Sequence, residues 1–216
     1  KANGINSNFS TARQTASSVN DGLFTFTNAI QAVFSSGRGG GTFSIVRSFF
    51  HFDVSSVTGV VSALKLQIQG STNTTSDGIV LKSTAFGGDG GTALSTSDYF
   101  NSIDYSTAYS AEFTTWSTGI SQISLNSTAE SDIQNNNDFT IVLVNHNNDF
   151  SNTAATTSTT QQNGINFSTN SNVRIKFTET AASSNITSLN TIARSNITSF
   201  NTIALASIDE INTIDN

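Results

Sequence analysis

The residues best suited to chemistry in this chain form a short polar segment after the apolar run FTIVLV. Asn145, His146, Asn148 and Asp149 fall within five consecutive positions there. Side-chain oxygens at this density can coordinate Ca²⁺ or hydrogen-bond to the hydroxyl groups of a sugar. The same residue types also build polar turns, in which Asn and Asp side chains bond to their own backbone. The turn is the favoured interpretation, and a calcium or glycan site remains the alternative.

A second polar segment, Asp98 to Tyr109, is rich in aromatic residues and is expected to be a long loop. Exposed aromatic rings can stack on sugar rings, so Tyr105 is a candidate for such a contact. Trp116, the only tryptophan, is expected in the core. A glycan, if one binds, is predicted to contact Tyr105 and the segment 145–149.

Residues that could support hydrolysis are few. The sequence contains no GxSxG, HExxH, P-loop or Rossmann glycine motif. Asp53 and Glu112 stand beside apolar residues, but Asp53 is expected in a turn and Glu112 is expected to point outward. His51 is expected on the strand face opposite Phe50 and Phe52. We therefore expect a protein that is not an enzyme and holds no cofactor.

Composition and charge exclude several classes of partner. The chain has 216 residues and a formal net charge of −6. Its nine Lys and Arg are scattered, so nucleic acid is not an expected partner. No apolar run approaches the roughly 18 residues of a membrane span, and the polar first 20 residues predict no signal peptide. Ser, Thr and Asn contribute 90 of the 216 residues, which predicts a polar but mostly uncharged surface.

The elements that must position these residues are predicted to be β-strands. In 62–69, Leu64, Leu66 and Ile68 alternate with polar residues, which is typical of a half-buried strand. The run 139–144 is apolar on both faces and is expected at the centre of a sheet. One helix is predicted after Leu125, with Ser127 and Glu130 as its capping box. The other predicted strands are 41–54, 79–86 and 173–177, with weaker candidates at 9–16, 29–35, 111–116, 120–125 and 165–167.

Many short strands with little helix predict an all-β protein, an antiparallel β-sandwich over residues 1–180. Residues 181–216 are a separate arm of three 11-residue repeats, which begin at Ser184, Ser195 and Ala206. The third, sixth and ninth positions of each repeat are apolar. These nine residues are Ile186, Leu189, Ile192, Ile197, Phe200, Ile203, Ile208, Ile211 and Ile214.

The spacing of the nine apolar residues matches one stripe on an α-helix and fits a simple strand badly. The Asn, Thr, Ser and Ile content opposes a helix, because these residues have mediocre helix propensity. In either conformation the stripe needs a partner surface. That surface could be the sandwich itself, copies of the arm in a trimer, or another protein, so the arm is predicted to serve oligomerisation or docking.

The segment Val46 to Ser55 (VRSFFHFDVS), followed by Ser62 to Leu66 (SALKL), resembles a pattern of jelly-roll modules akin to carbohydrate-binding modules and DNRLRE-type domains. Such modules occur in secreted bacterial proteins and in phage virion proteins, and the similarity covers residues 8–180. The repeats resemble C-terminal tails of marine bacteriophage structural proteins.

The resemblance implies a jelly-roll fold and a virion structural protein on the capsid or tail, either a decoration protein or a fibre or appendage subunit. Its partners would be other virion proteins or copies of itself, and a host-surface glycan is a further candidate. The alternative is a glycan-binding module of a secreted or cell-surface protein, located outside the cell. No catalytic residues transfer with the resemblance.

Overall fold

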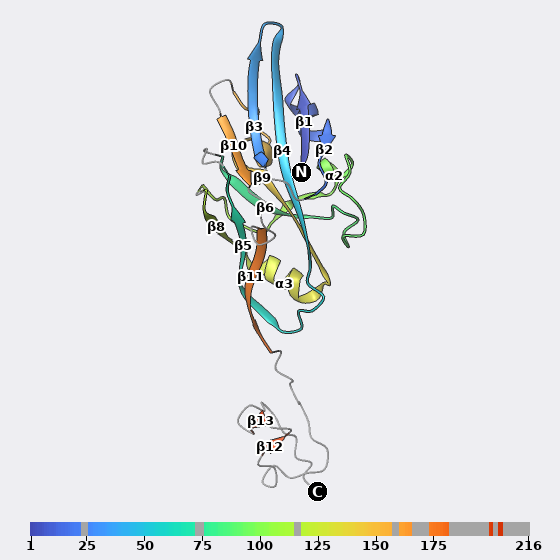
Figure 1. Cartoon of the computed structure of the whole chain (residues 1–216), viewed down its shortest axis with the longest axis vertical. Helices are drawn as coiled ribbons and strands as arrows, with labels where there is room; N and C mark the ends of the chain where they lie inside the picture. The colour runs from blue at the N-terminus through green and yellow to red at the C-terminus, as the bar shows by residue number, and fades with distance from the viewer. Residues whose placement is uncertain are drawn as a thin grey trace. The chain divides into compact units, whose positions relative to one another are not determined.

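The computed structural model describes residues 1–22, 26–71, 76–114, 118–156, 160–165, 173–181, 199–200 and 203–204. The chain divides into two compact units, Lys1–Thr180 and Ala181–Asn216 (Figure 1). Within the described part of the chain, no helix has the length and apolarity needed to cross a membrane.

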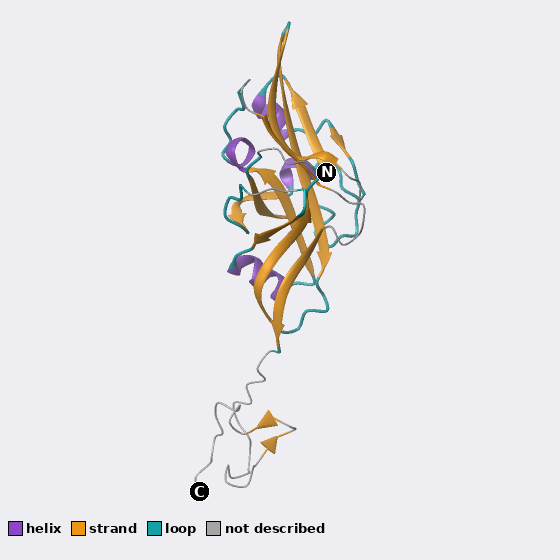
Figure 2. Ribbon diagram, turned by 60° about the vertical axis from the view of Figure 1, so that its left-hand side comes forward, coloured by secondary structure: helices purple, strands orange, loops and turns teal. Residues whose placement is uncertain are grey.

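The first unit contains two antiparallel sheets (Figures 1 and 2). The larger sheet has the order β10 (Thr160–Ile165), β3 (Phe26–Gly37), β4 (Gly40–Asp53), β9 (Asp138–Asn145), β6 (Gly78–Ser83) and β7 (Ile103–Ala108), with β1 (Ala2–Asn6) joining β4 to β2 (Ser18–Val19). The smaller sheet has the order β11 (Val173–Thr180), β5 (Val60–Gln69) and β8 (Ile120–Ser124). The prediction of an all-β protein with antiparallel sheets is confirmed.

One apolar core lies between the two sheets. From β5 it takes Leu64, Leu66 and Ile68, which confirms the face predicted from their alternation. From β9 it takes Ile141 and Leu143. The helix α3 (Ser127–Asn135) contributes Ala129 and Ile133 to the same core.

A second core covers the opposite face of the larger sheet. The alternate residues of β9, Val142 and Val144, point into it. Two short helices, α1 (Phe9–Gln14) and α2 (Asp98–Asn101), cover this face with Ala12 and Tyr99. Strand β9 is therefore buried on both faces, as its unbroken apolar run predicted.

Two predicted elements are wrong in type. Within the predicted strand 9–16, residues Phe9–Gln14 form α1 instead, and Asn8 caps this helix by accepting a hydrogen bond at Oδ1 from Thr11 N at 3.1 Å. The segment Asp98 to Tyr109, predicted as a long loop, forms α2 and then β7. Both errors have the same cause, since each segment gains its order from packing on the larger sheet.

Helix α3 begins where it was predicted, but its cap differs. The capping side chain is Asn126, which accepts from Ala129 N at 3.1 Å. Glu130 does not close a capping box with Ser127. Its Oε1 accepts instead from Leu64 N at 3.2 Å and so joins the helix to β5.

Other predicted boundaries shift by a few residues. The strand expected at 79–86 ends at Ser83, and the one expected at 165–167 corresponds to β10, which ends at Ile165. In place of a strand at 111–116, Phe113 forms a single bridge with Gly78. Trp116 lies outside the described residues.

The second unit has two described strands, β12 (Ser199–Phe200) and β13 (Ile203–Ala204), which pair antiparallel. In their register Phe200 pairs with Ile203. The four described residues of the arm are thus in strands rather than in a helix. The other seven members of the apolar stripe, Ile186, Leu189, Ile192, Ile197, Ile208, Ile211 and Ile214, lie outside the described residues.

Candidate functional site

The polar segment after β9 folds as a π-helical turn, η1 (His146–Phe150), capped by Asn145. The side-chain oxygen of Asn145 accepts from Asn148 N at 2.8 Å and from Asp149 N at 3.4 Å. Its amide donates to Ser76 Oγ at 3.0 Å and to Asp77 O at 3.2 Å. Asn145, Asn148 and Asp149 are all buried. The Asn145 oxygen and the Asn148 amide, which donates to Thr153 O at 3.0 Å, thus serve the local backbone, as the turn interpretation predicted.

Asp149 forms an ion pair with Arg47 of β4. Arg47 Nε donates to Oδ2 at 2.7 Å and Nη2 donates to Oδ1 at 2.7 Å, so the contact is bidentate. Both side chains are fully buried. Each oxygen of the carboxylate already accepts from a guanidinium, so Asp149 is not available as a Ca²⁺ ligand or as a contact for a sugar.

Three further side chains complete this buried cluster, which we call the Arg47–Asp149 cluster. Arg13 of α1 donates from Nε to Asp149 O at 2.7 Å and lies over the ring of Tyr105 at 4.4 Å from its centroid. Tyr105 donates its hydroxyl to Asp149 Oδ1 at 3.2 Å. Tyr99 stacks its ring under Arg47, with the guanidinium 4.1 Å from the centroid. The cluster therefore joins α1, β4, α2, β7 and η1.

The surroundings of the cluster shift its proton equilibria. Burial works to lower the pKa of Arg47, but Asp149 and then Tyr105 oppose it, and the net pKa lies above its ordinary value. Burial raises the pKa of Tyr105, and the Asp149 charge raises it further. Burial also raises the pKa of Tyr99. These shifts favour the protonated forms, in which Arg47 and Tyr105 donate to Asp149 and Tyr99 donates to Ala12 O.

His146 points away from the buried members of its segment. Its Nδ1 lies 3.1 Å from Glu112 Oε1 and its ring stacks on Phe150 at 5.5 Å. Asp53 accepts from Ser55 N at 3.0 Å, as a turn residue does. Tyr105 thus bonds to Asp149, whereas His146 contacts Glu112 and Phe150.

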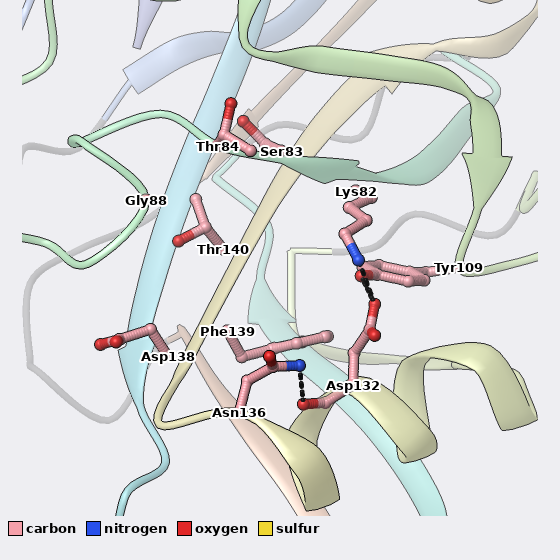
Figure 3. A pocket seen from close by; sticks show the side chains of 10 residues that line it. All are labelled: Lys82, Ser83, Thr84, Gly88, Tyr109, Asp132, Asn136, Asp138, Phe139 and Thr140. Atoms are coloured by element: carbon pink, nitrogen blue, oxygen red, sulfur yellow. Dashed lines mark hydrogen bonds and ion pairs between the residues drawn. The ribbon is translucent and has the colours of Figure 1, made fainter.

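A polar hollow of about 200 Å³ lies beside α3 (Figure 3). Strand β6, helix α3 and strand β9 surround it. Its wall is formed by Lys82, Ser83, Thr84, Gly88, Tyr109, Asp132, Asn136, Asp138, Phe139 and Thr140.

One part of the wall of the hollow is an ion pair, in which Lys82 and Asp132 neutralise each other. Lys82 Nζ lies 2.7 Å from Asp132 Oδ2, and the Tyr109 hydroxyl donates to the same oxygen (Figure 3). Burial, and then the hydrogen bond to Asp132, raise the pKa of Tyr109. Tyr109 stacks on Phe139 with ring centroids 5.3 Å apart, and both rings are buried. The hollow thus offers hydrogen-bonding groups but no exposed ring for a sugar to stack on.

Two residues that line the hollow, Thr140 and Asp138, also contact His51. Its Nδ1 lies 3.0 Å from Thr140 Oγ1 and its Nε2 lies 3.5 Å from Asp138 Oδ1. Phe50 and Phe52 pack toward the inter-sheet core, which confirms that His51 faces the other way. Gly90 covers the ring, with a φ of 74° and room for no side chain, since a Cβ there would lie 2.5 Å from Nε2.

Metal binding has little support in this arrangement. Among the His, Asp and Glu residues that the structure describes, no three come close enough together to hold a metal ion. What the hollow can do is hydrogen-bond to a small polyhydroxylated ligand through carboxylate, amide, hydroxyl and ammonium groups.

Sequence reasoning missed Arg13, Arg47, Lys82 and Asp132. One signal could have found Arg47, because a charged residue within the apolar run SIVRSFF needs a buried partner. Comparison with known proteins finds no matching protein-family model, no matching curated protein and no matching solved structure.

Proposed function

We propose that this chain is a non-enzymatic structural protein of a bacteriophage virion. It would be displayed on the capsid or tail, as a decoration protein or as a fibre or appendage subunit. Its C-terminal repeats would assemble it with copies of itself, for example as a trimer, or with other virion proteins. The observation that carries the proposal is the Arg47–Asp149 cluster.

The cluster supports this role because its polar groups hold the body closed. Arg47 also donates from Nη2 to Arg13 O at 2.8 Å and from Nη1 to Tyr99 O. Removing one partner of such a buried pair costs about 3–5 kcal/mol, because the other charge is left buried and uncompensated. The bonds tie α1 and η1 to β4, and the proposal assigns this body the role of the displayed module.

The order of the strands supports a jelly-roll form of the sandwich. The chain passes from the larger sheet to the smaller between β4 and β5, and returns between β5 and β6. It crosses again between β7 and β8, between β8 and β9, and between β10 and β11. Repeated crossing between two sheets is typical of jelly rolls.

The assembly role is tested on the full chain by changing the apolar stripe alone. Replacing Ile197, Phe200 and Ile203 with Ser should lower the mass measured by light scattering to that of a monomer. A matched control replaces Thr198, Asn201 and Thr202, which are off the stripe, with Ser. An unchanged mass for the stripe variant, or an equal loss in the control, would refute assembly through the repeats.

The hollow in Figure 3 favours a second candidate, a glycan-binding module outside the cell. Calorimetry with neutral oligosaccharides should then show binding that is lost in Asn136→Ala. Asn135→Ala is the control, since Asn135 is the preceding residue, the last of α3, but bonds to Ser131 and does not line the hollow. Absence of heat with any oligosaccharide, or equal weakening by both variants, would count against this candidate.

A further inference from the structure

The outer face of the smaller sheet concentrates positive charge on an acidic protein. Lys65 of β5 and Lys176 of β11 are directly opposite each other in the strand register. Directly paired residues have Cβ atoms about 4.5–5.5 Å apart, and like charges in such a pair destabilise the sheet. Arg174, on the same face, donates to Gln67 at 2.6 Å. The three strands carry three cations and one acid, whereas the whole chain has a net charge of −6.

The two lysines are not neutralised by an acid from the described residues. The only acid of the three strands is Glu179. Its Oε1 already accepts from Thr58 N at 2.9 Å and from Gly59 N at 2.7 Å. No described carboxylate forms an ion pair with Lys65 or Lys176.

Both lysines line one hollow of about 230 Å³ on the sheet. Its remaining wall comes from Ala63, Gln122, Phe177 and Thr178. The hollow therefore combines two lysines with an amide residue and a hydroxyl residue.

A β-bulge shapes this hollow. Lys176 pairs with Lys65 but Thr178 pairs with Ser62, so β5 has one more residue than β11 over this stretch. The bulge contains Ala63, whose φ of 54° is a left-handed conformation that side-chain-bearing residues seldom adopt. Strain of this kind persists where the surrounding structure holds it, and it gathers at ligand sites.

We propose that the hollow between Lys65 and Lys176 binds an oxyanion, a sulfate or carboxylate, carried by a saccharide. The anion places negative charge between two paired cations and takes charge-assisted hydrogen bonds from both. Gln122 and Thr178 supply hydrogen bonds for neighbouring sugar hydroxyls. Three cations on a chain of net charge −6 suit one anionic sugar unit rather than a long polyanion. This site is separate from the hollow in Figure 3, and its test does not depend on assembly.

Calorimetry on the full chain tests the site with three probes: a sulfated galactose tetrasaccharide, its desulfated counterpart and sodium sulfate. The sulfated sugar should bind at least about tenfold more tightly than its desulfated counterpart, since each charge-assisted hydrogen bond is worth about a factor of ten or more. It should also bind more tightly than sodium sulfate, because only the sugar offers hydroxyl groups to Gln122 and Thr178. Added salt should weaken this binding by screening the charges. Sodium sulfate that binds as tightly as the sulfated sugar, or equal affinity for the two sugars, would overturn the proposal.

Matched variants assign the binding to these side chains. Lys65→Gln and Lys176→Gln should each weaken binding at least about fivefold, and Lys65→Arg should restore it. Arg38→Gln makes the same charge change at the exposed tip of the β3–β4 hairpin and should alter affinity less than about twofold. Equal weakening in all the Gln variants would contradict the site. The lysine variants should also melt no lower than the parent, because they remove a like-charge pair.

Discussion

Arg47 and Asp149 are separated by 102 positions in the sequence, yet they form a two-pronged ion pair with both side chains fully buried. Arg47 comes from the middle of β4, whereas Asp149 comes from the turn after β9. Because β4 pairs with β9, the sheet itself brings the two side chains to the same region. Helix α1 then closes over them through Arg13.

Replacing Asp149 with Asn should cost about 3–5 kcal/mol of unfolding free energy, because it leaves two guanidinium groups buried without a carboxylate. Urea denaturation measures this loss. Glu112→Gln serves as the control, since its exposed pairing with His146 is worth about 1 kcal/mol or less. The double variant Arg47→Met with Asp149→Leu should be more stable than the Asp149→Asn variant. Equal losses for Asp149→Asn and Glu112→Gln would contradict the role given to the cluster.

All three tyrosines should titrate abnormally in the folded protein. The chain has only Tyr99, Tyr105 and Tyr109, and burial raises the pKa of each. A raised folded-state pKa means that the protonated phenol stabilises the fold. This contribution is complete below the unfolded pKa of about 10 and is lost as the pH rises above it.

Ultraviolet absorbance of tyrosinate provides the measurement. The folded protein should develop no tyrosinate signal near pH 10, and the signal should then appear together with alkaline unfolding. The same chain in concentrated urea should titrate near pH 10. A tyrosine that ionises near pH 10 before any unfolding would contradict its buried position.

Because Asn126 and not Ser127 caps α3, substitutions at these two neighbouring residues should change the unfolding free energy by different amounts. Asn126→Ala should destabilise the protein by about 1 kcal/mol, since the Ala129 amide would lose its partner. Ser127→Ala should change the unfolding free energy by less than about 0.5 kcal/mol. Thermal or urea unfolding of both variants decides between the two residues, and a larger loss for Ser127→Ala would restore the capping box.

Close packing of β1 against α1 predicts that Gly4 tolerates no side chain. A Cβ at Gly4 would lie 1.9 Å from Ala12 O and 2.5 Å from the Tyr99 hydroxyl. Gly4→Ala should therefore cost about 1–3 kcal/mol as the helix is displaced. Gly39→Ala is the matched control, because a Cβ there meets nothing within 4 Å. Similar unfolding midpoints for the two variants would show that α1 does not pack on β1 this closely.

The spacing of apolar residues along the chain was sufficient to predict an element where that element faces a core. The alternation in β5 and the unbroken apolar run in β9 predicted both strands and their faces, because the side-chain period of a strand is two. Pattern failed for α1, where Ala12 and Arg13 are ordered by contacts far along the chain. The same reasoning also failed for Asp98 to Tyr109, which forms α2 and β7 on the larger sheet.

The candidate sites depend on long-range pairing, and no single-sequence pattern encodes that. Only the register of β5 with β11 places Lys65 and Lys176 opposite each other. Asp149 was noticed as a possible ligand, whereas its partner Arg47 was noted only as part of a resemblance. A rule that every charge within an apolar strand needs a partner would have predicted a buried ion pair, but not which residues form it.

Assembly through the C-terminal repeats is tested most directly by the solution mass of the full chain and of residues 1–180. The shorter chain keeps both apolar cores and every strand of the two sheets, so it should fold alone. Light scattering on a sizing column should give a trimer or larger assembly for the full chain and a monomer for residues 1–180. The same number of chains per particle for the full chain and for residues 1–180, whether one or several, would contradict assembly through the repeats.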